Sequence, residues 1–169
     1  MLQRNAWVVG AHKGLADQKR VDAAPETTHP ELPKVLVAED NNVLGDVIRF
    51  NLLRAGCDVT LVRNGKEARE QLSTSIFDLL LTDFEMPHIN GAELCRIARE
   101  ELELHSMAIL LCSAKSLEID HDRLKSKYSI ASILAKPFSM SELTDLVLKL
   151  IAPAHGVQLS SFSKTVLSH

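Results

Sequence analysis

The sequence has few aromatic residues and no hydrophobic run long enough to cross a bilayer. Aromatic residues make up 4% of the 169-residue chain, so its core must be built mainly from aliphatic side chains. A membrane-spanning helix needs about 20 consecutive apolar residues. The apolar patch at 6–9 is also too short for the hydrophobic part of a signal peptide. These absences favour a soluble protein of the cytoplasm.

The chain also lacks a cysteine framework and a strong excess of charge. It has three cysteines, Cys57, Cys95 and Cys112, which are an odd number with no CxxC spacing. We therefore expect buried, reduced thiols and neither disulfides nor a cysteine-bound metal. The formal net charge of −3 argues against a general surface for nucleic acid or anionic membranes.

Composition and length suit one folded domain flanked by tails. Hydrophobic residues make up 46% and charged residues 24% of the chain, which is typical of globular proteins. Residues 1–33 mix charged and amide side chains and include three prolines, a pattern that predicts a disordered leader. Residues 34–151 carry the apolar pattern of a domain, and the Ser-rich residues 152–169 predict a flexible tail.

Short apolar runs alternate with helical patterns along the domain. The runs predict buried strands at 34–38, 58–62, 79–83, 107–112 and 130–135. The segments between and after them predict helices at 42–55, 66–72, 92–101, 117–127 and 139–151. Strands that alternate with helices form a parallel sheet with helices on both faces, so the predicted fold class is doubly wound α/β.

The first predicted helix shows the clearest division of its faces. Asn41 or Asn42 caps its start, and Gly56 ends it. The residues at helical spacing that we expect to face the core are Leu44, Val47, Ile48, Leu52 and Ala55. Residues 64–65, Asn-Gly, predict a turn before the second helix.

Polar residues follow four of the predicted strands. They are Glu39 with Asp40, then Asp83, then Ser113, and finally Lys136. Because the carboxyl ends of parallel strands share one edge of a sheet, these side chains can converge. Taken alone, Asp83 could equally cap the helix that follows it. The presence of the other residues favours a site.

Three carboxylates at one edge repel each other, and a bound cation would relieve that repulsion. An all-oxygen set without a cluster of His or Cys indicates Mg²⁺ or Mn²⁺. Lys136 adds an ammonium group, and a cation beside an ammonium group suits an anion such as a phosphoryl group. A carboxylate such as Asp83 can accept a phosphoryl group, and the Ser113 hydroxyl can donate a hydrogen bond to it.

The strand-end motifs resemble a known family. Segments 83–91 (DFEMPHING) and 136–138 (KPF), with Glu39-Asp40 and Ser113-Ala114, look like the CheY-like receiver domain of two-component response regulators. The resemblance covers residues 34–151 and implies a flavodoxin-like five-stranded sheet of order 2-1-3-4-5. It also implies a signalling module rather than an enzyme. Its phosphoryl group would come from a sensor histidine kinase or a histidine phosphotransfer protein.

The resemblance implies that Asp83 is the phosphoacceptor and part of a cation site. Asp40, Asp83 and the backbone carbonyl of Glu85 would bind Mg²⁺, and Glu39 would act through water. An unidentified downstream protein would read the phosphorylated state. The resemblance leaves room for a phosphorylation-dependent homodimer, and implies neither direct nucleic-acid binding nor membrane insertion.

The resemblance also assigns the residues around the phosphoryl group. Lys136 would neutralise the phosphoryl oxygens, while Ser113 and the Ala114 amide would contact them. The bond between Lys136 and Pro137 would be a cis peptide.

Two departures from the family keep other functions open. An aromatic residue usually stands where this chain has Ile133, and a glycine is often found near Ser129. A pseudo-receiver that only binds partners therefore remains an alternative. A haloacid-dehalogenase-type phosphatase is another alternative, although that family has an Asp-x-Asp pattern after its first strand. Here the pattern is Asp83-Phe84-Glu85, on the third strand.

Two hypotheses concern the rim of the site. Glu85 and Lys115 could form a gate that slows the approach of water, against the alternative of an exposed pair worth about 0–1 kcal/mol. Phe50 and Leu53 lie off the inward stripe of the first helix and could dock the phosphodonor, although scattered exposed apolar residues are common. His88 is expected to be a solvated loop residue.

Overall fold

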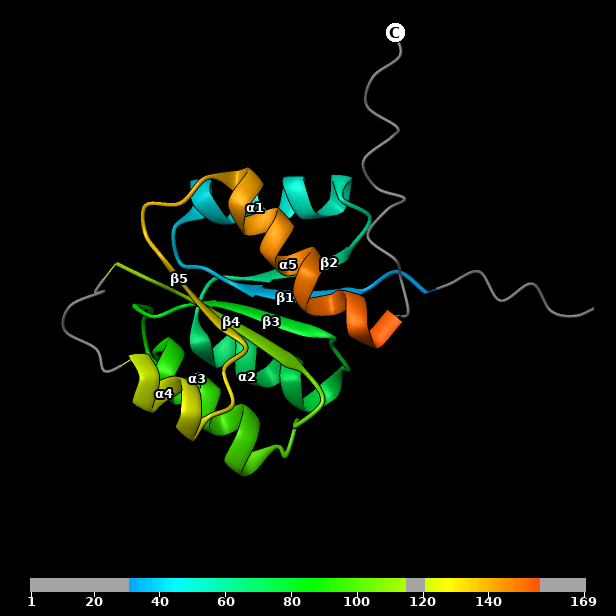
Figure 1. Ribbon diagram of the computed structural model, residues 1–169. Helices are drawn as coiled ribbons and strands as arrows, with labels where there is room; N and C mark the ends of the chain where they lie inside the picture. The colour runs from blue at the N-terminus through cyan, green and yellow to red at the C-terminus, as the bar shows by residue number, and fades with distance from the viewer. Residues whose placement is uncertain (1–30, 115–120, 156–169) are drawn as a thin grey trace, which may run out of the picture. The chain divides into compact units, whose positions relative to one another are not determined.

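The computed structural model describes residues 31–114 and 121–155 (Figure 1). Its elements in chain order are β1 (Lys34–Ala38), α1 (Asn42–Arg54), β2 (Asp58–Val62), α2 (Gly65–Thr74), β3 (Leu79–Asp83), α3 (Gly91–Arg96), the π-helical turn η1 (Ile97–Glu101), β4 (Ala108–Ser113), α4 (His121–Lys127), β5 (Ser132–Ala135) and α5 (Met140–His155). Most of the predicted leader, the tail from 156 onward and Lys115 lie outside the described residues. None of the described helices combines the length and apolar composition that crossing a membrane requires.

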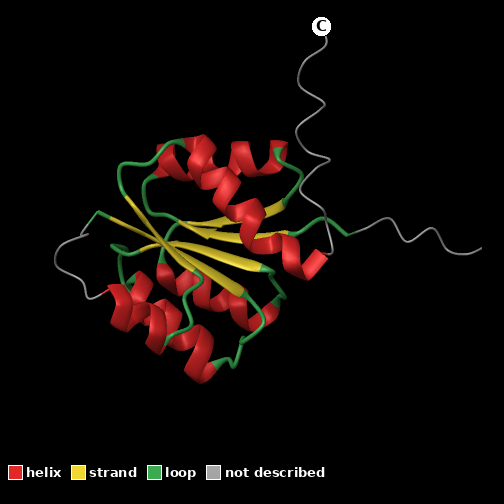
Figure 2. Cartoon of the chain, viewed as in Figure 1, coloured by secondary structure: helices red, strands yellow, loops and turns green. Residues whose placement is uncertain are grey.

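The five described strands form one parallel sheet in the order β2-β1-β3-β4-β5, which confirms the predicted fold and strand order. β3 lies in the middle, with Leu80 opposite Leu36 of β1 and Ile109 of β4. Helices α1 and α5 cover one face, and α2, α3 and α4 cover the other (Figures 1 and 2). The carboxyl ends of all five strands therefore share one edge.

The sheet is buried on both faces by aliphatic side chains. On β3, Leu80 packs with Leu72 of α2 and other residues of that face. Its neighbour Leu81 packs with Ile48 of α1 and Val147 of α5. A central strand with two buried faces needs consecutive apolar residues, which explains the Leu79–Leu81 run.

Helix α1 confirms the predicted cap but corrects the predicted inward face. The Asn41 side chain accepts a hydrogen bond from the Leu44 amide at 3.0 Å. The buried residues of the helix are Gly45, Ile48 and Leu52. Val47, predicted to face the core, is 40% exposed. Gly45 is buried instead because Arg63 lies over it, and a Cβ there would come within 2.5 Å of the Arg63 Nη1.

Other helices begin or end away from the predicted residues. Asn64 caps α2 by accepting a 2.9 Å hydrogen bond from the Glu67 amide, so residues 64–65 start a helix and do not form a separate turn. Ser139, one of the two predicted candidates, caps α5. Helix α5 continues to His155, past the predicted boundary at 151.

The third predicted helix is not α-helical throughout. Its second half is the π-helical turn η1, whose wider turn leaves three consecutive residues buried: Ile97, Ala98 and Arg99. The Arg99 guanidinium donates hydrogen bonds to four main-chain carbonyls, those of Leu104, Met107, Tyr128 and Ser129. Met107, predicted to start β4, lies one residue before that strand, and its carbonyl accepts a hydrogen bond from Arg99. The strand β5 likewise begins at Ser132 and not at 130.

All three cysteines are free and buried, which confirms the sequence prediction. Burial raises the pKa of Cys57 to about 11, and those of Cys95 and Cys112 to about 12. Since thiols react as thiolates, we expect no cysteine of the folded protein to react with Ellman's reagent, and all three to react in denaturant. Absorbance of the released thiolate measures this. A fast-reacting thiol in the native protein would contradict the structure.

Candidate functional site

Three carboxylates meet where β1 and β3 end. Glu39 and Asp40 follow β1 directly, and Asp83 is the last residue of β3. One carboxylate oxygen from each lies within 4.8 Å of the other two. Glu39 is 1% exposed and Asp83 is 7% exposed, whereas Asp40 is open to solvent. The cap of α3 is Asn90, so the alternative role of Asp83 as a helix cap is wrong.

Lys136 follows β5 and completes the group. Its Nζ lies 3.0 Å from Oδ2 of Asp83 and 3.1 Å from Oε2 of Glu39. The Lys136 amide donates a 2.8 Å hydrogen bond to the carbonyl of Ser113, which is buried at the end of β4. The peptide bond between Lys136 and Pro137 is cis. Ala114, next along the chain, is exposed beside the same edge.

Two backbone amides and one hydroxyl that sequence analysis did not identify donate hydrogen bonds to Asp83 and Glu39. The Phe84 amide donates to Oδ1 of Asp83 at 2.8 Å. The Thr82 hydroxyl donates to the Asp83 carbonyl at 3.0 Å, and the Asn41 amide donates to Oε1 of Glu39 at 3.3 Å. Backbone amides leave no signature in side-chain identity, so no signal in the sequence could have revealed the two amide donors. Thr82 is the one donor that its residue type, directly before Asp83, could have indicated.

The site carries more negative than positive charge. Burial raises the pKa of Glu39, and the charge of Asp83 raises it further. Burial also raises the pKa of Asp83, outweighing the opposing effects of Lys136 and the Phe84 amide. Burial alone would lower the pKa of Lys136, but its hydrogen bonds and charge interactions with Asp83 and Glu39 raise it. Lys136 therefore remains protonated, but its single positive charge does not balance the negative charges of the three acids.

The geometry of the acids fits a small divalent cation. Oxygen ligands of Mg²⁺ at 2.0–2.1 Å lie about 3–4 Å apart around the octahedron. Oxygens of Glu39, Asp40 and Asp83 within 4.8 Å of one another need only small adjustments to reach that spacing. The donor set is all oxygen, which suits Mg²⁺ or Mn²⁺.

The remaining residues singled out from the sequence lie in different parts of the domain, namely the loop after β3, strand β5 and the segment before β5. Glu85 and His88 are exposed in the loop after β3, where His88 has a positive φ of 68°. Ile133 is half-buried against the core on the face of α2 to α4. Ser129 has a φ of 48°, the left-handed conformation that glycine adopts most readily. The hypothesis of a gate stays a prediction because Lys115 lies outside the described residues.

Comparison with known proteins identifies the family. The model of the response regulator receiver domain matches residues 35–148. The chain therefore belongs to the response regulator receiver family, and its class is that of phosphorelay signalling domains. The haloacid-dehalogenase alternative is accordingly set aside.

Two curated relatives are about one third identical to the chain over the aligned residues. The response regulator receiver protein CpdR of Brucella abortus (strain 2308) is 36% identical over 124 residues, which cover 73% of this chain and 100% of CpdR. The phosphate regulon transcriptional regulatory protein PhoB of Rhizobium meliloti (strain 1021) is 33% identical over 131 residues, covering 77% of this chain. The chain spans 57% of the length of PhoB.

Solved structures support the same relationship. The receiver domain of the Francisella response regulator 1452 superposes with a TM-score of 0.64 at 30% identity, covering 72% of this chain and 98% of that one. The receiver domain of the sensor histidine kinase PA1611 from Pseudomonas aeruginosa PAO1 superposes with a TM-score of 0.63 at 28% identity, covering 72% and 99%. That structure has a magnesium ion coordinated in its active site cleft.

Proposed function

We propose that Asp83 accepts a phosphoryl group from a phosphohistidine on a sensor histidine kinase or a histidine phosphotransfer protein. The acyl phosphate then changes the affinity of the domain for a protein target. The observation that carries this proposal is the contact of one ammonium group, Lys136 Nζ, with both Asp83 and Glu39 at 3.0 and 3.1 Å. A buried acid with a cation on one side is arranged to hold an incoming anion.

In the transfer, an Asp83 carboxylate oxygen forms a bond to phosphorus as the bond from phosphorus to the imidazole nitrogen breaks. The electron pair of that bond stays on the imidazole, which then takes up a proton. Asp83 is held for this step by the Phe84 amide on Oδ1 and by Lys136 on Oδ2. The chemistry depends on positioning and charge neutralisation.

Glu39, Asp40, Asp83 and the Glu85 carbonyl are the proposed groups around a Mg²⁺ or Mn²⁺ ion. When bound, the cation supplies the positive charge that the buried acids and the phosphoryl oxygens need. The magnesium ion in the related PA1611 receiver supports this choice.

Two further residues are proposed to act on the phosphoryl group after transfer. The Ser113 hydroxyl and the Ala114 amide would donate hydrogen bonds to its oxygens. Ser113 is buried at the end of β4, and its carbonyl is tied to the Lys136 amide. A movement of Ser113 toward the phosphoryl group would therefore also displace the end of β5. Ile133 of that strand has no aromatic ring that could change its orientation in response.

The test is covalent labelling with a small phosphodonor. Wild-type protein with acetyl phosphate and Mg²⁺ is expected to gain one phosphoryl group, detected by intact-mass spectrometry and mapped to Asp83. Asp83→Asn should gain none, whereas Asp46→Asn, which alters an exposed acid of α1, should behave as the wild type. A pseudo-receiver would give no adduct in any of the three proteins, and that outcome would overturn the proposal.

An exposed apolar patch on α1 is proposed to dock the phosphodonor. We define the α1 patch as Val43, Val47, Phe50 and Leu53, which are 75%, 40%, 57% and 45% exposed. The Arg54 guanidinium lies over the Phe50 ring, 5.6 Å from its centre. Helix α1 begins two residues after Asp40, so the patch extends from the edge that carries the site.

Removing the centre of the α1 patch should slow transfer between proteins but not labelling by a small molecule. Phe50→Ala/Leu53→Ala is expected to lower the rate of phosphotransfer from a phosphohistidine protein by about tenfold or more, as for other central apolar contacts. Ile76→Ala, which truncates a side chain 87% exposed before β3, is the matched control. Equal transfer rates in the double variant and the control would refute docking at this patch.

A further inference from the structure

Residues 84–90 connect β3 to α3 and include Glu85, a proposed cation ligand through its carbonyl. The loop closes on its own base, because the Gly91 amide donates a 2.9 Å hydrogen bond to the Phe84 carbonyl. The Phe84 amide in turn donates to Oδ1 of Asp83 at 2.8 Å. The position of the Glu85 main chain therefore depends on how closely the ends of the loop are held.

Helix α3 starts directly against the first end of this loop. A Cβ on Gly91 would lie 2.3 Å from the Asp83 carbonyl oxygen and 2.9 Å from the Phe84 Cα. Real Cβ atoms do not approach other atoms within 3.0 Å. Because both neighbours are main chain, neither can rotate aside, and a side chain at 91 would have to displace the strand end or the helix.

Helix α2 starts against the other end of the loop in the same way. A Cβ on Gly65 would lie 2.1 Å from the Ile89 carbonyl oxygen and 2.7 Å from the Ile89 Cβ. Gly45 differs, because its nearest neighbour is the tip of the flexible Arg63 side chain at 2.5 Å. The contacts at Gly65 and Gly91 are thus the ones that a side-chain movement cannot relieve.

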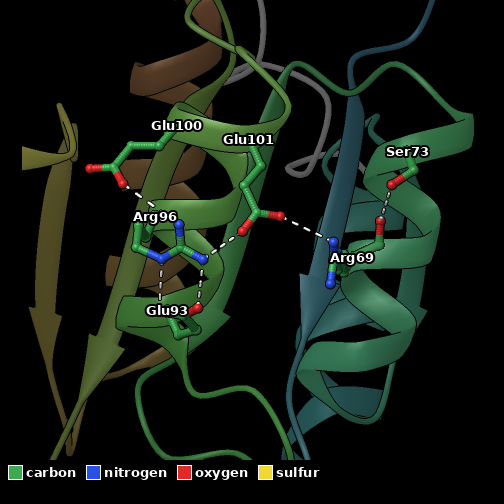
Figure 3. Close-up of polar contacts among 6 residues, drawn as sticks. All are labelled: Arg69, Ser73, Glu93, Arg96, Glu100 and Glu101. Atoms are coloured by element: carbon green, nitrogen blue, oxygen red, sulfur yellow. Dashed lines mark hydrogen bonds and ion pairs between the residues drawn. The ribbon is translucent and has the colours of Figure 1, made fainter.

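Ion pairs tie the two helices to each other beyond their first turns (Figure 3). Arg69 of α2 lies 3.1 Å from Glu101 of η1, and Arg96 of α3 lies 2.6 Å from the same Glu101. Arg96 also pairs with Glu93 at 2.8 Å. An outward shift of α2 that made room for a side chain at Gly65 would break the Arg69–Glu101 pair.

We propose that Gly65 and Gly91 are positioning residues for the cation site. The absence of a side chain at both positions lets the first turns of α2 and α3 hold loop 84–90 from its two ends, which fixes the Glu85 main chain beside Asp83. Affinity for the cation therefore depends on two residues that do not themselves touch it. This inference rests on the proposed function, in which the Glu85 carbonyl is a cation ligand.

The test measures Mg²⁺ affinity and stability separately. Isothermal titration with Mg²⁺ gives the Kd, and thermal unfolding without metal gives the Tm, for Gly65→Ala, Gly91→Ala and the control Gly45→Ala. We expect the first two variants to bind Mg²⁺ at least about tenfold more weakly than the wild type, and the control to stay within about twofold. Val59→Ala, which removes core volume from β2, should lower the Tm while keeping the wild-type Kd.

A further variant frees the loop without adding a Cβ to either helix. Ile89→Gly removes the side chain that Gly65 contacts and adds backbone freedom, so it should also weaken Mg²⁺ binding. If the alanine variants fail to fold, the Mg²⁺ affinity of Ile89→Gly tests the inference in their place. Wild-type affinity in every glycine-site or loop variant that folds would overturn the inference. Failure of the wild-type protein to bind Mg²⁺ would instead overturn the proposed function.

Discussion

Arg99→Met is expected to remove about 3–5 kcal/mol of stability, which is a large part of the 5–15 kcal/mol of a typical domain. Arg99 is 7% exposed, and its guanidinium bonds four carbonyls. Methionine fills much of the same space but donates no hydrogen bond. The carbonyls of Met107 and Tyr128 would then stay buried without this donor, and those of Leu104 and Ser129 would lose it at partly buried positions. Burial lowers the pKa of Arg99, yet an arginine keeps its proton in proteins.

Urea unfolding at equilibrium measures this loss, and two variants calibrate it. Arg99→Lys keeps the charge but cannot reach four acceptors with one ammonium group, so it should fall between wild type and Arg99→Met. Arg69→Met removes an exposed ion pair with Glu101 and should cost under about 1 kcal/mol. If Arg99→Met were as stable as Arg69→Met, the four-carbonyl arrangement would have no stabilising role.

Asp83→Asn is expected to raise the Tm of the metal-free protein at neutral pH and to remove most of its response to Mg²⁺. Burial raises the pKa of Asp83, so its charged form is unfavourable in the fold, and an uncharged amide of similar shape relieves that cost. A cation at one hundred times its Kd stabilises a protein by about 2.7 kcal/mol, and the variant lacks the central ligand for it. Differential scanning calorimetry with and without Mg²⁺ measures both effects.

The pH dependence of this stabilisation has a defined sign. The folded-state pKa of Asp83 lies above its ordinary value of 3.8, so the folded protein binds the proton more tightly than the unfolded chain does. The favourable contribution of this group is complete below pH 3.8 and is lost as the pH rises through the folded-state pKa. The advantage of Asp83→Asn should therefore grow from acidic to neutral pH. A constant difference in Tm across that range would contradict the raised pKa.

The sequence was sufficient for the existence of the strands and for the strand-end residues, because both depend on local patterns. The strand order came from the resemblance to the receiver family and not from the local patterns. The Leu79–Leu81 run is buried throughout, as expected for a short apolar run that ends in turn-forming residues and forms a strand covered on both faces. A carboxylate that follows such a strand must lie at the edge where the other strands end. Glu39, Asp40 and Asp83 therefore came together as predicted.

Features that depend on contacts between distant segments were not predictable. Val47 fits a helical stripe, but the Arg63 side chain, distant in sequence, makes Gly45 the buried position. Arg99 looks like the charged outer face of a helix until the π-helical turn places it inward. The raised pKa of Asp83 likewise reflects burial, which no residue type encodes by itself.

The contact between Glu39 and Lys136 joins residues 97 positions apart in the chain. During synthesis on the ribosome, Glu39 and Asp83 emerge long before Lys136, the lysine that pairs with both of them. A chain made beyond Asp83 but not yet to Lys136 thus holds the like charges of Glu39 and Asp83 without that ammonium group, which disfavours early closure of this edge of the sheet. Lys136 directly follows β5, the last of the described strands to be translated, so the acidic edge gains this counter-charge only after all five of them have been made.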